Sequence, residues 1–166
     1  MPFAGAAKQL AAVFGFGFSN GFAFDTINQG PASFQYSDKT LFANAITNGR
    51  NSSEYVNKLI TFTGLAFKIP SDAKTILAFN KNFINFVPDT AWQFDDKTVK
   101  IPVKGWWQGA YKKFGKGRFV AFGEAAMFSA QLGGPQKSKM GMNADIAKDN
   151  YKLLLNIIHW LDRKLN

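Results

Sequence analysis

Residues 117–124 read Gly-Arg-Phe-Val-Ala-Phe-Gly-Glu, and this stretch decides the predicted fold. Residues 119–123 are a short apolar run without alternating polar side chains, which is typical of a strand covered on both faces. Strands of this kind occur mainly in parallel sheets that have helices on either side. The preceding Gly-Lys-Gly-Arg at residues 115–118 predicts a turn. We therefore expect a buried parallel strand that ends at Glu124.

The C-terminal stretch predicts the clearest helix of the chain. Residues 148–164 carry apolar side chains at a period of 3.6, with Asp149 or Asn150 as N-cap. The predicted core face comprises Leu154, Ile157, Ile158, Leu161 and Leu165, and the opposite face comprises Lys152, Asn156, His159 and Arg163. With the buried strand, this helix predicts a three-layer α/β fold whose mostly parallel sheet is flanked by helices.

Weaker patterns cover the rest of the chain. Residues 3–14 predict an amphipathic helix. The phenylalanines between residues 16 and 24 alternate around Ser19-Asn20-Gly21, which predicts a hairpin or a sharp strand bend. Strands are expected within residues 53–67 and 75–79, and irregular or loop structure within 29–39, 83–102 and 133–143.

Composition restricts the classes of function. The 166 residues predict one domain, 1–166, with 20 Lys and Arg against 11 Asp and Glu, a net charge of +9. Only three of the cations are Arg, and the lysines are spread along the chain, which argues against a nucleic-acid-binding protein. No apolar run is long enough to span a membrane. No basic region precedes the apolar start, so the chain as written is expected to be cytoplasmic; a periplasmic or secreted location stays open if it is a fragment.

Residues 117–131, with the central Gly-Glu-Ala-Ala-Met-Phe-Ser, resemble an uncharacterised bacterial family. Its members are class I glutamine-amidotransferase-like, flavodoxin-type domains related to trehalose-utilisation domains. Residues 18–25, 105–110, 141–143 and 156–161 agree with this resemblance, which covers nearly the whole chain. The resemblance implies that a β-α-β unit is missing before Met1. We therefore expect a fragment, an internally started product, or a protein that fills the gap by self-association.

The residues of this chain exclude the glutamine-hydrolysing chemistry that the resemblance would imply. Glutamine hydrolysis needs a nucleophilic cysteine with a nearby histidine, and a serine in its place needs the same base. The chain has no cysteine, and its one histidine, His159, falls on the predicted polar face of the last helix. No cofactor and no metal site are predicted.

A ligand site is predicted where the strand ends at Glu124. In open parallel sheets, ligands bind at the carboxyl ends of the strands. The predicted ligand-binding residues are Glu124, Ser129, Gln131, Asn143, Asp25 and Trp106. Carboxylate, amide, hydroxyl and tryptophan together favour a saccharide or a similar polar small molecule. Two alternatives stay open: Glu124 accepts backbone N–H bonds within its own loop, and Trp106 belongs to the core.

The leading hypothesis is a non-catalytic ligand-binding domain. A second hypothesis is an assembly module that forms a homo-oligomer. A third is a hydrolase in which Glu124 acts as a general base. Enzymatic activity is not favoured.

Overall fold

The computed structural model describes residues 7–28 and 30–166, which form an antiparallel β-rich fold. Every strand pair in this part of the chain is antiparallel. The helices are α1 (Ala7–Val13), α2 (Ala45–Asn48) and α3 (Asn150–Leu161), with a 3-10 turn, η1 (Ala126–Phe128). The strands are β1 (Gly17–Phe18), β2 (Phe22–Asp25), β3 (Ala32–Gln35), β4 (Lys58–Thr61), β5 (Phe67–Lys68), β6 (Lys74–Ala78), β7 (Phe83–Val87), β8 (Val99–Pro102), β9 (Trp107–Phe114), β10 (Gly117–Phe122), β11 (Ala130–Gly133) and β12 (Ser138–Gly141).

The main sheet is built around the β9–β10 hairpin. Its strand order is β1-β5-β9-β10, and β6 also pairs with β9, so the sheet curls into a half-barrel. Gly117 pairs with Phe114, which leaves Gly115 and Lys116 as a two-residue turn, and Gly115 has the positive φ (56°) that such turns require. The turn predicted at residues 115–118 is therefore confirmed.

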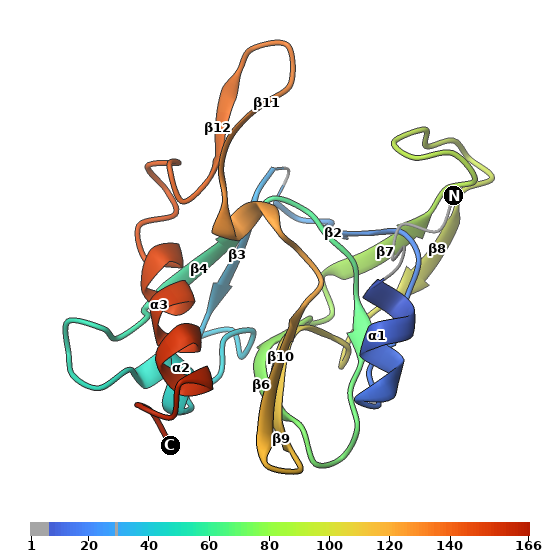
Figure 1. Ribbon diagram of the computed structural model, residues 1–166. Helices are drawn as coiled ribbons and strands as arrows, with labels where there is room; N and C mark the ends of the chain where they lie inside the picture. The colour runs from blue at the N-terminus through green and yellow to red at the C-terminus, as the bar shows by residue number, and fades with distance from the viewer. Residues whose placement is uncertain (1–6, 29) are drawn as a thin grey trace.

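The expected parallel strand is wrong, and the packing shows why. Phe119 and Ala121 of β10 face a cluster beneath α1, whereas Val120 and Phe122 face the main core beneath α3. Figure 1 shows the β9–β10 hairpin between α1 on one side and α3 on the other. An unbroken apolar run indicates that both faces of a strand are covered, but it does not specify the direction of the neighbouring strand.

Three smaller antiparallel units surround this sheet. They are β2-β7-β8, β3-β4 and the β11–β12 hairpin, which projects from the body in Figure 1. β7 and β8 lie within residues 83–102, β3 within 29–39, and β11–β12 around 133–143, so the irregular structure expected there is wrong. Phe18 and Phe22 end up in different sheets, which is the sharp bend predicted at Ser19-Asn20-Gly21.

Helix α3 begins at the predicted position, with Asp149 as N-cap, but it packs through a different face. Leu153, Ile157 and Trp160 are buried, whereas Ile158 and Leu161 of the predicted core face are about half exposed. The inner face also carries two buried polar residues, Asn150 and Asn156. Asn150 donates to Ile60 O (2.8 Å) and Met127 O (3.1 Å), and Asn156 donates to Ile46 O (2.8 Å). These amides anchor α3 to its neighbours by hydrogen bonds.

Helix α1 lies within the predicted helix 3–14, whose first residues fall outside the described part of the chain. Its expected apolar face is largely solvent-exposed: Leu10 and Val13 are exposed and Ala11 is buried. Within residues 7–28 and 30–166, no helix has the length and apolar character needed to cross a membrane.

The antiparallel architecture overturns the predicted three-layer parallel α/β fold. It also overturns the expected flavodoxin-like, glutamine-amidotransferase-like domain, because that fold is defined by a parallel sheet. The described residues form no β-α-β crossover unit, because no two of their strands pair in parallel.

Candidate functional site

Glu124 is the second residue after β10 and lines a cavity of about 310 Å³. The cavity lies where the ends of three segments meet: the bend before β2, the loop between β4 and β5, and the turn after β10. Gln131 at the start of the β11–β12 hairpin closes one side. The lining residues are Gly21, Phe22, Phe62, Thr63, Gly64, Leu65, Trp92, Gly123, Glu124, Ala125, Ala126, Gln131 and Met140. We call this space the Glu124 cavity.

The Glu124 carboxylate is buried and holds its own loop. Its side chain is 8% exposed, and both carboxylate oxygens accept the Met127 N–H, at 3.1 and 2.9 Å. Burial raises the pKa of Glu124 to about 7, and the backbone N–H groups around it lower the pKa by less. The loop-fixing role named as an alternative is therefore present, and the carboxyl changes charge near neutral pH.

The backbone beside Glu124 is packed so tightly that only glycine fits. A Cβ on Gly64, whose φ is 125°, would lie 2.6 Å from the Cβ of Glu124 and 2.6 Å from Gly123 O. A Cβ on Gly123 would lie 2.1 Å from Leu65 O. Leu65 N–H donates to Gly123 O at 2.8 Å, which joins the two segments. This close contact fixes the position of the Glu124 carboxyl.

Of three other predicted residues, Gln131 lines the same cavity, and Ser129 and Asn143 are hydrogen-bonded to residues that line it. Gln131 lines it, whereas Ser129 is used locally, since its hydroxyl donates to Ala126 O at 2.9 Å. Asn143, just after β12, donates to Gln131 O at 3.3 Å, which joins the two strands at the base of the β11–β12 hairpin. Asn143 Oδ1 is buried and accepts no hydrogen bond from the described residues.

Asp25 and Trp106 do not join the Glu124 cavity. Asp25 closes a turn by accepting the N–H groups of Ile27 (2.9 Å) and Asn28 (3.3 Å), and it lines a separate cavity with Phe24 and Phe86. Trp106 is half-buried against the main core, with Lys68 Nζ 4.1 Å from its ring centroid. The core position named as the alternative for Trp106 is therefore the observed one.

The tryptophan at the rim of the cavity is Trp92, which the sequence patterns did not single out. Trp92 is 62% exposed, and its ring centroid lies 4.2 Å from that of Phe22. Phe94 packs edge-on against both Phe22 and Trp92. Trp92 lies in the segment expected to be irregular. The available signal was a large aromatic residue within the polar loop between β7 and β8.

Strained backbone gathers around this cavity. Two of its lining residues other than glycine have positive φ angles, Thr63 (109°) and Trp92 (65°), as do its glycines Gly21 (112°) and Gly64 (125°). Positive φ is costly for residues with a Cβ and often occurs at ligand-binding sites, where surrounding contacts maintain it.

Two buried amide side chains, Gln108 and Asn85, hydrogen-bond to the backbone at or next to the lining of the cavity. Gln108 donates to Thr63 O at 3.2 Å, and Asn85 donates to Asn20 O at 2.8 Å, next to Gly21. The side-chain oxygens of both residues are buried and accept no hydrogen bond from the described residues. Buried acceptors without a donor are costly inside a protein.

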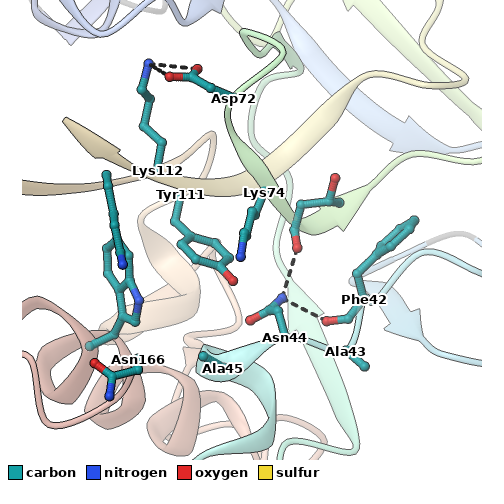
Figure 2. Close-up of a pocket in the computed structure, with 12 residues that line it drawn as sticks. Phe42, Ala43, Asn44, Ala45, Asp72, Lys74, Tyr111, Lys112 and Asn166 are labelled. Atoms are coloured by element: carbon teal, nitrogen blue, oxygen red, sulfur yellow. Dashed lines mark hydrogen bonds and ion pairs between the residues drawn. The ribbon is translucent and has the colours of Figure 1, made fainter.

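A larger cavity of about 720 Å³ lies between α2, β6 and β9 (Figure 2). Lys74, Lys112 and Lys113 line it, so it is basic, and several of its polar side chains have partners within the fold. Lys112 pairs with Asp72 at 2.8 Å. Asn44 donates to Phe42 O and Thr75 O and accepts from the first turn of α2. We therefore place the candidate site in the smaller Glu124 cavity.

Among the described residues, no three His, Asp or Glu side chains lie close enough together to hold a metal ion. His159 is half-buried on α3, and its Nδ1 accepts no hydrogen bond from the described residues. It does not line any of the cavities described above.

Comparison with protein-family models, curated proteins and solved structures finds no match, so the chain is not assigned to the amidotransferase-like family or to any other.

Proposed function

We propose that this protein binds a saccharide, or a polar small molecule of similar size, in the Glu124 cavity. The observation that carries the proposal is a buried carboxyl group in a cavity whose rim is an exposed tryptophan. Binding cavities combine apolar walls with a few placed polar groups, and ligand sites start at roughly 300 Å³. This cavity of about 310 Å³ is therefore suited to one sugar ring rather than to a long chain.

Each wall of the cavity matches one feature of a sugar. Trp92, supported by Phe22, offers an aromatic face against which the C–H groups of a sugar ring can pack. Glu124 and Gln131 offer hydrogen-bonding groups for hydroxyls. Close to neutral pH the carboxyl exists in both protonation states, and the protonated form donates as well as accepts.

Hydrolysis with Glu124 as general base is a weaker proposal. A pKa near 7 suits proton transfer, but glycoside hydrolysis uses two carboxyl groups on opposite sides of the bond. Among the described residues that line the cavity, Glu124 is the one carboxylate, and Asp25 lies at a different cavity. Binding without turnover is therefore favoured.

The test is a titration of the purified chain with a panel of mono- and disaccharides, followed by calorimetry and by tryptophan fluorescence. Trp160 is buried and Trp106 and Trp107 are half-buried, so a ligand that covers Trp92 changes the most exposed fluorophore. We expect Trp92→Ala and Glu124→Gln each to weaken binding about tenfold or more, which corresponds to roughly 1.4 kcal/mol.

Trp106→Phe is the matched control, because Trp106 lies away from the cavity, and it should bind as tightly as the unmodified chain. Equal affinity in all three variants would show that the ligand binds outside the Glu124 cavity. A panel without any binding would reject the saccharide, and the same variants could then be screened with other polar ligands.

A further inference from the structure

The cavity of about 720 Å³ between α2, β6 and β9 has more than twice the volume of the Glu124 cavity. Its size is within the range of small-molecule pockets, about 300–1,000 Å³. The sheet forms one wall, through Lys74 of β6 and through Tyr111 and Lys113 of β9. Figure 2 shows Lys74 and Tyr111 facing residues 42–45 on the other side. We call this space the basic cavity.

Strand pairing places three cations on the face of the sheet that lines the basic cavity. Lys74 pairs with Tyr111 across β6 and β9, and Arg118 pairs with Lys113 across β10 and β9. Side chains of directly paired residues point to the same face, and so do residues two apart in one strand, such as Tyr111 and Lys113. Lys74, Lys113 and Arg118 therefore lie on one face of three neighbouring strands.

The fold gives these three cations no counterion. Among the described residues, no ion pair joins Lys74, Lys113 or Arg118 to a carboxylate. Like charges at directly paired positions, as at Lys113 and Arg118, destabilise a sheet. A charged cluster that reduces stability and that the fold does not neutralise is typical of a binding site, here one for an anion.

The acidic groups at the basic cavity do not offset this charge. Asp72 pairs with Lys112 at 2.8 Å. Lys112 alternates with Tyr111 along β9, so its side chain lies on the other face of the sheet, where its Nζ is 3.4 Å from Phe14 O. Asn166, the last residue of the sequence, lines the cavity and takes part in none of the ion pairs among the described residues. The unpaired side-chain charge at this cavity is therefore positive.

Two polar groups on the same face are held in fixed positions. Arg118 Nη1 donates to Trp160 O and to Leu165 O (2.6 Å), and the guanidinium lies 4.8 Å from the Trp160 ring centroid. Tyr111 is buried, and burial raises the pKa of its phenol, so the phenol stays protonated. The Ala45 N–H donates to the phenol oxygen, which leaves the phenol proton free to be donated to a ligand.

We infer that the basic cavity binds a phosphorylated small molecule, with its phosphate groups on Lys74 and Lys113. Both lysines are exposed and unpaired, so they can bind an anion without breaking an ion pair. A phosphate ester carries about −1.5 to −2 charges at neutral pH and accepts several hydrogen bonds. Phe42, which is 39% exposed, gives the cavity an apolar surface for the body of the ligand. A nucleotide has both parts.

Calorimetry of the whole chain with pyrophosphate, AMP, ATP, adenosine and a short single-stranded DNA tests the inference. We expect ATP to bind, adenosine not to bind, and the affinity for ATP to fall as salt is added. Lys74→Gln and Lys113→Gln should each weaken ATP binding about fivefold or more. Lys137→Gln is the matched control, because Lys137 is exposed between β11 and β12 and lines none of the cavities described; it should bind ATP normally.

Thermal unfolding gives a second readout that separates binding from a structural role. Without ligand, Lys113→Gln should melt at the same temperature as the unmodified chain or higher, because it removes the like-charge pair with Arg118. Excess ATP should raise the melting temperature of the unmodified chain more than that of Lys113→Gln. Glu124→Gln should bind ATP as the unmodified chain does, since Glu124 lines a different cavity.

Four results would each overturn the inference. The first is no binding of ATP or pyrophosphate at millimolar concentration in low salt. The second is equal weakening of ATP binding by the Lys74, Lys113 and Lys137 variants, which would show a diffuse effect of charge. The third is equal binding of adenosine and AMP. The fourth is DNA that binds more tightly than ATP and loses affinity in Lys74→Gln and Lys113→Gln, which would assign this surface to a nucleic acid.

Discussion

Glu124→Gln should change how the stability of this protein depends on pH. In the folded chain, burial holds the pKa of Glu124 at about 7, against 4.5 for a free glutamate side chain. Between these two values the folded chain keeps a proton that the unfolded chain releases, so stability falls as pH rises from about 4.5 to about 7. A difference of about 2.5 pKa units corresponds to a loss of about 3 kcal/mol.

Glutamine isolates this contribution because it does not titrate. Its side-chain oxygen can still accept the Met127 N–H, so the loop after β10 keeps its hydrogen bond. Urea unfolding of both chains at several pH values between about 4 and 8 gives the difference in free energy of unfolding. We expect this difference to move by about 3 kcal/mol in favour of Glu124→Gln as pH rises, which is roughly 10 °C in melting temperature for a chain of this size.

Glu54 provides a control with the opposite sign. The hydrogen bonds from Arg50 lower the pKa of Glu54 to about 2, so its stabilising contribution is present above about pH 4.5 and is lost as pH falls toward 2. The free-energy difference between Glu54→Gln and the unmodified chain should therefore stay constant from about pH 5 to 8 and shrink only as pH falls from about 4.5 toward 2. A free-energy difference between Glu124→Gln and the unmodified chain that stays constant from about pH 4 to 8 would refute the argument from burial.

Two further predictions concern the packing that holds the site. Asn150 is completely buried and makes three hydrogen bonds to Ile60 and Met127. Asn150→Ala should therefore lower the free energy of unfolding, measured in urea, by about 2–4 kcal/mol. A loss below about 1 kcal/mol, equal to that of the exposed control Lys148→Ala, would contradict its anchoring role. Gly123→Ala should destabilise the fold by several kcal/mol, because its Cβ would lie 2.1 Å from Leu65 O. Gly117→Ala, whose nearest contact is at 3.4 Å, should change the free energy of unfolding by less than about 1 kcal/mol. Similar melting temperatures for the two variants would show that the backbone near Glu124 can move.

Local patterns predicted the elements whose sequence signal is strong. β6 overlaps the predicted strand 75–79, α3 falls within the predicted helix 148–164, and the turn at residues 115–118 joins β9 to β10. The direction of strand pairing was predicted wrongly because β10 is apolar on both faces. That pattern reports that both faces are covered, and it is the same for parallel and antiparallel neighbours.

The elements that were missed have patterns altered by polar or exposed residues. In β7 the buried Asn85 occupies a position where an apolar residue would complete the alternation. β11 and β12 are largely exposed on both faces, so they have no apolar alternation to detect. In α3 the buried Asn150 and Asn156 on the inner face, together with the exposed apolar residues Leu155, Ile158 and Leu161, shifted the apparent apolar side away from the core.

The candidate site was predicted in part for a related reason. Glu124 and Gln131 are close in sequence and line one cavity, whereas Asp25 was expected to join them only through a parallel sheet that does not exist. Trp92 reaches the cavity through an aromatic cluster with Phe22 and Phe94. Its place depends on the pairing of β2 with β7, and no local pattern reports that pairing.

The identity of residue 124 is itself an argument for a ligand. The loop after β10 needs an acceptor for the Met127 N–H, and a glutamine would supply one without an ionisable group. With a pKa of about 7 in the folded chain, the carboxyl is instead expected to lower stability by about 3 kcal/mol at neutral pH, because its charged form is poorly solvated in the cavity. Groups that reduce stability without structural benefit are typical of binding and catalytic sites. If Glu124→Gln is more stable at neutral pH and has also lost binding, the carboxyl is explained by its ligand; if it is more stable and binds equally well, Glu124 serves only its own loop.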